Sequence, residues 1–182
     1  REVAKVAVLG AMYGQTTGLG ASALRGLERE YPVAMAYLDR AARLAESGQD
    51  LRTVGGRRVR MSSESDEPDT GSTSDPEADQ RVARSRAAAR GRYGRNAMVQ
   101  GAAAEFFKTW AVIVRARLAR LDARIVLCLH DELLVHVRDD QAAQVVDLLD
   151  ACLHEAAHRW HPTSGVRFVT DTSVVHSWAD AK

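Results

Sequence analysis

Apolar residues recur every three to four positions along much of the chain, a spacing typical of helices that bury one face. Tyr31-Pro32 separates two of these stretches, because proline suits the first turn of a helix and disfavours helical backbone in the residue before it. Gly48 is expected to stop the second of them. The predicted helices cover 1–13, 19–27, 31–46, 81–121 and 141–159.

Shorter apolar runs predict strands instead. Residues 125–129 and 133–137 flank His130-Asp131-Glu132, so we expect a hairpin with carboxylates at its tip. A second hairpin is expected within residues 51–60, around Gly55-Gly56. Residues 166–170, Val-Arg-Phe-Val-Thr, predict a last strand. Two long helices supply the expected core, through Met98, Ala102, Phe106, Trp110 and Val114 and through Val145, Leu148, Leu149, Cys152 and Ala156.

The acidic segment 62–80 has no such pattern. It contains seven Asp and Glu residues and no Lys or Arg, so it is predicted to be disordered. The rest of the chain contains 25 Lys and Arg and 17 Asp and Glu. Its formal net charge is therefore +8, compared with +1 for the whole chain. A basic chain of this kind suits a polyanionic partner. We further hypothesise that 62–80 folds over the neighbouring arginines when no nucleic acid is bound.

Length and composition narrow the class of protein. The 182 residues suffice for one core and a small appendage, and the sequence contains no apolar run long enough for a membrane span. Two cysteines argue against a disulfide scaffold and favour a reducing, cytoplasmic setting. The opening Arg-Glu-Val-Ala-Lys, charged and without Met, leads us to expect a piece of a longer polypeptide.

Four residues at four-residue spacing form a stripe on the first predicted helix: Arg1, Lys5, Leu9 and Tyr13. Two cations followed by an aromatic ring are suited to holding phosphates beside a flat base. A solvent-exposed face with a core tyrosine is the simpler interpretation of the same stripe.

Arg92, Asn96 and Gln100 form a second stripe, on the long helix. Arginine suits phosphates, whereas Asn and Gln meet base edges or sugars.

Asp131 and Glu132 interrupt an apolar hairpin, and a Mg²⁺ site is one reason to place carboxylates there. An ordinary polar turn is the alternative. His154, His158 and His161 lack the carboxylate or Cys that would complete a zinc-type spacing.

Three separated patterns, in this order, resemble motif B, the Arg–Asn–Gln helix and motif C of family A DNA polymerases. They are Arg1-(x3)-Lys5-(x3)-Leu9-(x3)-Tyr13-Gly14, Arg92-(x3)-Asn96-(x3)-Gln100-Gly101, and His130-Asp131-Glu132. The tail around Trp178 also resembles the C-terminus of that family, and the whole is most similar to its actinobacterial exonuclease–polymerase branch. The resemblance covers nearly all of the chain except 62–80.

The resemblance implies a role for each residue of the first motif. Arg1 and Lys5 would contact the phosphates of the incoming dNTP, and Tyr13 would stand at the nascent base pair. Lys5 would also stabilise charge on the leaving group or donate a proton to it. Leu9 occupies a nucleotide-binding position where the family usually has Phe or Tyr. We therefore expect poor acceptance of dideoxynucleotides, which efficient dideoxy termination would refute.

The other two motifs imply contacts with primer–template DNA. Arg92, Asn96 and Gln100 would line the duplex minor groove near the primer terminus, and His130 would touch the terminal phosphodiester of the primer.

Asp131 would be a metal-binding carboxylate and Glu132 an auxiliary one, in catalysis by two Mg²⁺ ions. The other metal-binding Asp of the family lies in motif A, upstream of the first helix, so motif A and the thumb are expected in a preceding part of the polypeptide. We therefore expect the isolated chain to be inactive.

The sequence thus predicts an α+β fold: helical fingers plus part of the antiparallel palm sheet of a right-hand polymerase. The predicted organisation is fingers helices and a hairpin at 1–60, the disordered acidic insert at 61–80, and a palm segment with the carboxylate hairpin at 81–182. The predicted function is DNA synthesis in replication or repair.

Two alternatives remain at this point. A non-catalytic DNA-binding module is disfavoured by the intact Lys5, Tyr13 and Asp131. A single-subunit RNA polymerase relative is disfavoured by Glu132.

Overall fold

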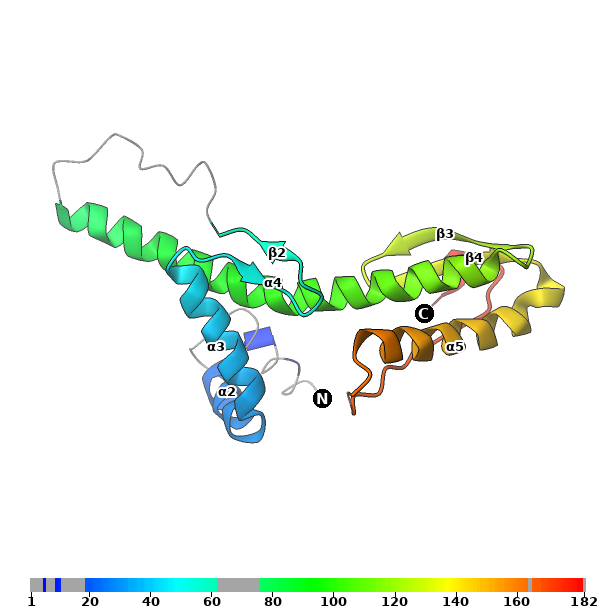
Figure 1. The fold of residues 1–182 in the computed structure, drawn as a ribbon, viewed down its shortest axis with the longest axis horizontal. Helices are drawn as coiled ribbons and strands as arrows, with labels where there is room; N and C mark the ends of the chain where they lie inside the picture. Colours follow the sequence, from blue (N-terminus) through cyan, green and yellow to red (C-terminus); the bar gives the residue numbers. More distant parts are fainter. Residues whose placement is uncertain (1–4, 6–8, 11–18, 62–75, 164, 182) are drawn as a thin grey trace. The chain divides into compact units, whose positions relative to one another are not determined.

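The computed structural model describes residues 5, 9–10, 19–61, 76–163 and 165–181 (Figure 1). Its helices and strands are, in chain order, α2 (Leu19–Glu30), α3 (Pro32–Glu46), β1 (Leu51–Arg52), β2 (Arg58–Val59), α4 (Pro76–Leu118), β3 (Ala123–Leu129), β4 (Glu132–Val137), the 3-10 turn η2 (Asp139–Gln141), α5 (Ala142–Trp160) and the 3-10 turn η3 (Trp178–Asp180). Both sheets among these residues are antiparallel strand pairs, β1–β2 and β3–β4. The α+β class is confirmed.

The chain divides into two compact units, Arg1–Ala102 and Ala103–Lys182, with the boundary inside α4. Among the described residues, the buried apolar side chains form two clusters in the first unit and one in the second.

In the first unit, α3 and the β1–β2 hairpin pack on one face of α4. The buried residues are Ala41, Ala45, Leu51, Met61 and Met98. Gly48 ends α3 with a φ of 78°, a left-handed conformation that glycine adopts without steric cost. Its N–H donates to the carbonyl of Ala45 over 2.9 Å, so the helix end is capped as expected.

Asp50 closes the open end of the β1–β2 hairpin. Its Oδ1 accepts from the backbone N–H of Met61 over 3.0 Å, and its Oδ2 pairs with Arg58. These contacts, the backbone hydrogen bond first, lower the pKa of Asp50. Hydrogen bonds that favour the charged form thus hold the two strand ends together.

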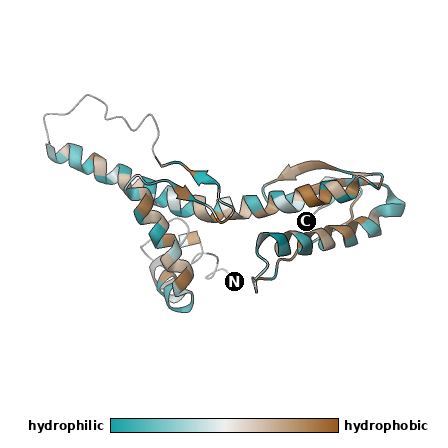
Figure 2. Ribbon diagram, in the orientation of Figure 1, coloured by the Kyte–Doolittle hydropathy of each residue, from teal (hydrophilic) through white to brown (hydrophobic). Residues whose placement is uncertain are grey.

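The second unit is built on the C-terminal part of α4 and on α5. Trp110, Val114 and Leu118 pack against α5, whose buried residues are Val145, Leu149, Cys152, Leu153 and Ala156. The indole Nε1–H of Trp110 donates to the carbonyl of Leu149 over 3.1 Å, which satisfies the polar atom of a buried ring. Figure 2 shows the hydrophobic residues gathering along β3 and this part of α4.

The predicted strand at 166–170 is wrong. Among the described residues of this segment none pairs with a neighbouring strand, and Val166 and Val169 are exposed. Phe168 instead stacks on Phe106, with ring centroids 4.1 Å apart and planes 27° apart. Phe168 thus packs against the apolar cluster of the second unit without belonging to a strand.

The predicted disordered segment 61–80 is also wrong at both of its ends, where the structure is ordered. Met61 is buried in the first unit, and α4 already begins at Pro76, so residues 76–80 are helical. Residues 62–75 lie outside the described part of the chain. No helix among the described residues combines the length and the apolar character that crossing a membrane requires.

Candidate nucleic-acid and metal site

Two of the four residues of the first predicted stripe fall in the described part of the chain. Lys5 and Leu9 are both helical and exposed, with Leu9 at 42%. Gly10, directly after Leu9, is buried. Arg1 and Tyr13 lie outside the described residues, so their placement stays a prediction.

The second stripe lies on α4, as expected. Arg92 and Gln100 are exposed and Asn96 is half-buried between them. The Oδ1 atom of Asn96 is buried and has no hydrogen-bond partner among the described residues. A buried acceptor without a hydrogen bond costs free energy in the folded chain.

Glycines fix the direction in which this stripe points. An added Cβ would lie 2.5 Å from the Cβ of Ala45 at Gly94 and 2.7 Å from Cγ2 of Thr53 at Gly101, so α3 and the Thr53 side chain, directly after β1, approach α4 too closely for a side chain at these glycines. With that face of α4 packed, the face with Arg92 is turned to solvent.

Two further arginines of α4 secure the same packing. Arg95 pairs with Asp39 of α3 over 2.8 Å, and its side chain is only 13% exposed. Nη2 of Arg90 donates to the carbonyl of Glu46, at the end of α3, over 3.1 Å. These two arginines therefore hold α3 and are distinct from the exposed Arg92.

The motif with two carboxylates occupies the turn of the β3–β4 hairpin in the second unit. Leu129 pairs with Glu132, which leaves His130-Asp131 as a two-residue turn. His130 has a φ of 44°, the single positive φ among the described non-glycine residues. His130, Asp131 and Glu132 are all exposed, so the sharp turn presents the three side chains together to solvent.

A cavity of about 450 Å³ lies beside this turn. Asp131 and Glu132 line it together with Thr170 and Asp171 from the extended segment after α5. Asp171 was missed by the sequence reasoning, which took the segment up to Thr170 as a strand. The polar run Thr170-Asp171-Thr172-Ser173 after an apolar stretch was the available signal.

Carboxylate and hydroxyl oxygens beside a cavity are the donors that Mg²⁺ prefers. No three candidate metal ligands come together within the described residues. The described carboxylates are therefore suited to contributing to a metal site, and a complete ligand set is not present among them.

The Arg–Asn–Gln pattern on α4 and the carboxylate turn of the β3–β4 hairpin are the features on which the resemblance to family A DNA polymerases rests. The model of DNA polymerase family A matches residues 1–180. The chain belongs to DNA polymerase family A.

Two curated relatives agree with this assignment. DNA polymerase I of Pseudomonas aeruginosa is 31% identical over 196 residues, which cover all of this chain and 19% of that protein. DNA polymerase theta of Caenorhabditis elegans is 33% identical over 88 residues, which cover 48% of this chain and 5% of that protein. The chain thus spans about a fifth of the length of the bacterial relative.

A solved structure is similar as well. The polymerase domain of Pol1 from M. smegmatis, in complex with DNA primer-template and dNTP, aligns with a TM-score of 0.59 and 26% identity. The alignment covers 85% of this chain and 27% of that one. The α+β prediction and the family resemblance are confirmed by these comparisons.

Proposed function

We propose that this chain is the fingers-and-palm part of a template-directed DNA polymerase, which transfers a nucleotide from a dNTP to the 3′-hydroxyl of a primer. The observation that carries the proposal is the match to DNA polymerase family A over residues 1–180. Primer–template DNA and dNTPs are the proposed partners, as in the complex of the M. smegmatis polymerase domain. Replication or repair of DNA in the cytoplasm is the proposed setting.

The exposed side chain of Lys5 is proposed to bind the phosphates of the dNTP together with Arg1. An ammonium group there stabilises charge that develops on the leaving pyrophosphate. Leu9 and Tyr13 are proposed to complete the nucleotide site, at the sugar and at the nascent base pair.

The exposed face of α4 is proposed to bind the primer–template duplex near the primer terminus. Arg92 suits a phosphate, and Gln100 suits sugars or base edges. Asn96, half-buried between them, suits sugars or base edges in the minor groove.

The β3–β4 turn is proposed to supply the catalytic groups. Asp131 would hold Mg²⁺, with Glu132 as an auxiliary carboxylate and His130 on the terminal phosphodiester of the primer. When bound, the metal supplies Lewis-acid stabilisation of the phosphoryl oxygens and lowers the pKa of the primer hydroxyl. The turn keeps both carboxylates exposed, so they are accessible to a metal ion and to the primer end.

We propose that this chain acts as part of a larger polypeptide. Asp131 and Glu132 form one carboxylate cluster, and the resemblance implies that the other metal-binding Asp comes from motif A, upstream of the first helix. We expect the isolated chain of 182 residues to bind primed DNA weakly and to extend no primer.

The decisive experiment is primer extension with Mg²⁺ by the full-length polypeptide, comparing the wild type with Asp131→Asn and with Asp122→Asn. Asp122 is exposed directly before β3 and serves as the control for loss of a charge. Asp131→Asn should lower the rate at least about a hundredfold while primed duplex still binds, since a group that acts in the transition state is lost. Asp122→Asn should extend like the wild type.

Failure of all three proteins to extend a primer, with duplex binding intact, would contradict the polymerase assignment and favour a non-catalytic DNA-binding module. Preference for ribonucleotides over dNTPs would favour a relative of the single-subunit RNA polymerases.

A further inference from the structure

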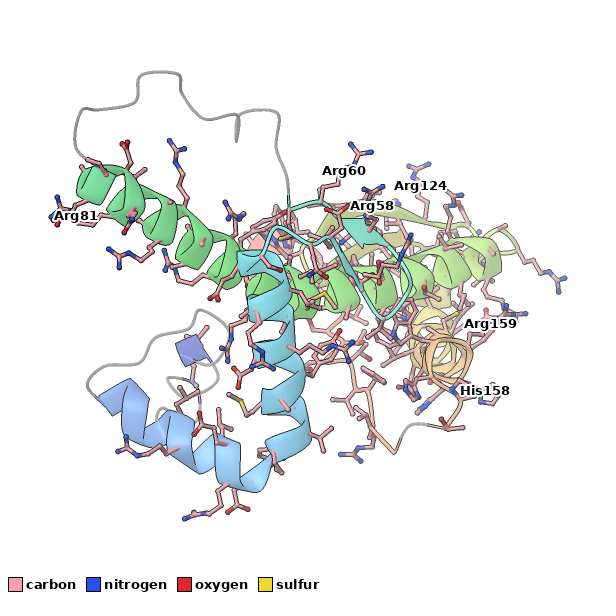
Figure 3. The ribbon with its side chains drawn as sticks, turned by 60° about the vertical axis from the view of Figure 1, so that its left-hand side comes forward. Arg58, Arg60, Arg81, Arg124, His158 and Arg159 are labelled. Atoms are coloured by element: carbon pink, nitrogen blue, oxygen red, sulfur yellow. The ribbon has the colours of Figure 1, made fainter. Side chains whose placement is uncertain are left out.

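The polar stripe of α4 does not end at Arg92. On a helix with 3.6 residues per turn, positions 81, 84, 88, 92 and 96 follow one another at spacings of three or four and lie on one side. Arg81 and Arg84 therefore continue the side of α4 that presents Arg92 and Asn96, and both are exposed. Figure 3 shows Arg81 at the start of α4, among side chains that point outward from the helix.

The arginines of α4 fall into two groups by what they contact. Arg90 and Arg95 bind Glu46 and Asp39 and so hold α3 in place. Arg84 and Arg92 are exposed, and neither has a hydrogen bond or ion pair within the described part of the chain. Arg90 and Arg95 therefore have a structural role in packing α3 on α4. The described part of the fold shows no structural role for Arg84 and Arg92.

Ala88 and Glu77 lie on the same side of α4 as these arginines and affect where a polyanion can bind. Ala88 lies between Arg84 and Arg92, so a short side chain separates the two cations and leaves room for a backbone to approach. Glu77 lies one helical turn before Arg81 on the same side and would repel a polyanion. The region of α4 suited to a polyanion therefore begins at Arg81.

We propose that Arg81 and Arg84 extend the duplex-binding face of α4, contacting DNA phosphates beyond those reached by Arg92. Eight residues of helix, from Arg84 to Arg92, span about 12 Å. Phosphates on one strand advance about 3.4 Å along the duplex axis per nucleotide, so the added contacts lie roughly three to four base pairs further on. The inference rests on the proposed function, because it takes Arg92 as a duplex contact.

Arg86 provides a matched control on the same helix. It is exposed and has no hydrogen bond or ion pair with another described residue, as is the case for Arg84. At about 100° of rotation per residue, Arg86 lies about 160° from Arg84, about 140° from Arg81 and about 120° from Arg92 around the helix, so it points away from these three arginines. A comparison of Arg84→Ala with Arg86→Ala changes the net charge equally and tests position alone.

The experiment measures affinity of the full-length polypeptide for primed duplex DNA across a series of salt concentrations, for the wild type, Arg84→Ala, Arg86→Ala and Arg92→Ala. Loss of one phosphate contact lowers the slope of log K against log salt by about 0.9 and lowers affinity roughly eightfold at about 0.1 M salt. We expect this change for Arg84→Ala and for Arg92→Ala, and no change of slope for Arg86→Ala. Circular dichroism should show unchanged helix content in all variants, because alanine favours helices.

Two results would overturn the inference in different ways. If Arg84→Ala matches Arg86→Ala while Arg92→Ala weakens binding, the extension is wrong and the proposed duplex site stands. If Arg92→Ala also leaves affinity and slope unchanged, the proposed duplex site itself is wrong.

Discussion

His130 combines an unusual backbone with a proposed contact to the primer. A positive φ costs a residue with a Cβ about 1–2 kcal/mol, although histidine tolerates it better than most. The two-residue turn between Leu129 and Glu132 requires this conformation. A glycine would relieve the cost, so a side chain kept at such a position suggests a role for the imidazole.

Replacing His130 by glycine and by alanine separates the backbone from the side chain. His130→Gly should leave the free energy of unfolding unchanged or raise it by about 1 kcal/mol, and His130→Ala should lower it. Both variants should extend a primer more slowly than the wild type, since both lack the imidazole. Urea unfolding and primer extension measure the two effects.

Full activity in His130→Gly would show that the turn alone matters and would contradict the proposed contact with the primer. Equal stability of the glycine and alanine variants would contradict the assigned backbone cost.

At the scale of elements, the packing of α4 on α3 depends on the absence of a side chain at Gly94. An added Cβ would lie 2.5 Å from the Cβ of Ala45 and 3.3 Å from the carbonyl oxygen of Ala41. Alanine favours a helix over glycine by about 1 kcal/mol, but overpacking against a neighbouring backbone typically costs about 1–3 kcal/mol. The clash should therefore outweigh the gain in helix propensity.

Gly94→Ala is predicted to lower the free energy of unfolding by about 1–2 kcal/mol. Gly26, within α2, is the matched control, because an added Cβ meets no atom within 4 Å. Gly26→Ala should raise stability by up to about 1 kcal/mol. Urea unfolding followed by circular dichroism checks both. Stabilisation by both substitutions would show that α3 moves away from α4 without cost.

In the second unit, Glu155 of α5 joins two arginines. Its Oε2 accepts from Arg117 of α4 over 2.8 Å and its Oε1 accepts from Nη2 of Arg159 over 2.7 Å. These bonds, that from Arg117 first, lower the pKa of Glu155 below its ordinary value of 4.5. A carboxyl group with a lowered pKa in the folded state stabilises that state above the ordinary pKa and loses this effect as pH falls through the folded value.

Glu155→Gln is therefore predicted to be less stable than the wild type at neutral pH, with a difference that shrinks at acidic pH below the folded pKa. The measurement is urea unfolding, followed by tryptophan fluorescence, over a series of pH values. Asp147→Asn, at an exposed position of α5, provides a control for loss of a charge on the same helix. A difference between Glu155→Gln and the wild type that does not vary with pH would contradict the assigned ion pairs.

The same scale shows what periodicity could predict. The repeats at Leu38, Ala41 and Ala45 and at Val145, Leu149 and Cys152 located helices whose apolar faces are buried, because burial follows helical spacing directly. β3, at Ala123–Leu129, contains the predicted apolar run 125–129 and begins two residues before it. The prediction of a strand at 166–170 was wrong because its β-branched residues fit a strand, whereas strand formation also requires the segment to run along another strand in the fold, which no local pattern reveals.

The candidate site was also predictable in part, because helical spacing alone places some of its residues on one face. Arg92, Asn96 and Gln100 lie at four-residue spacing, so a helix brings them onto one face without further information. Asp171 lies forty residues after Asp131 in the sequence, and only the fold places both beside one cavity. The unpartnered Oδ1 of Asn96 likewise depends on packing that the sequence does not display.

At the scale of the whole molecule, the charges are separated along the chain. Residues 62–75 contain five of the 24 acidic residues and none of the 25 basic ones. The first part of α4, which follows directly, contains the arginines proposed to bind DNA. An acidic residue within about a Debye length of a bound DNA phosphate repels that phosphate, and this length is near 10 Å at 0.1 M salt.

Replacing Glu64, Asp66, Glu67, Asp69 and Asp75 by their amides changes the formal net charge from +1 to +6 and leaves α4, which begins at Pro76, intact. We predict several-fold tighter binding of primed duplex at low salt, because repulsion of the phosphates is removed, and a difference that vanishes near 1 M salt, where the Debye length is about 3 Å. The same affinity measurement tests it, with Ser→Ala changes at Ser62, Ser63 and Ser65 as a control that alters no charge. Unchanged affinity at low salt would show that this segment does not compete with DNA, and α4 would then bind the duplex independently of the acidic residues that precede it.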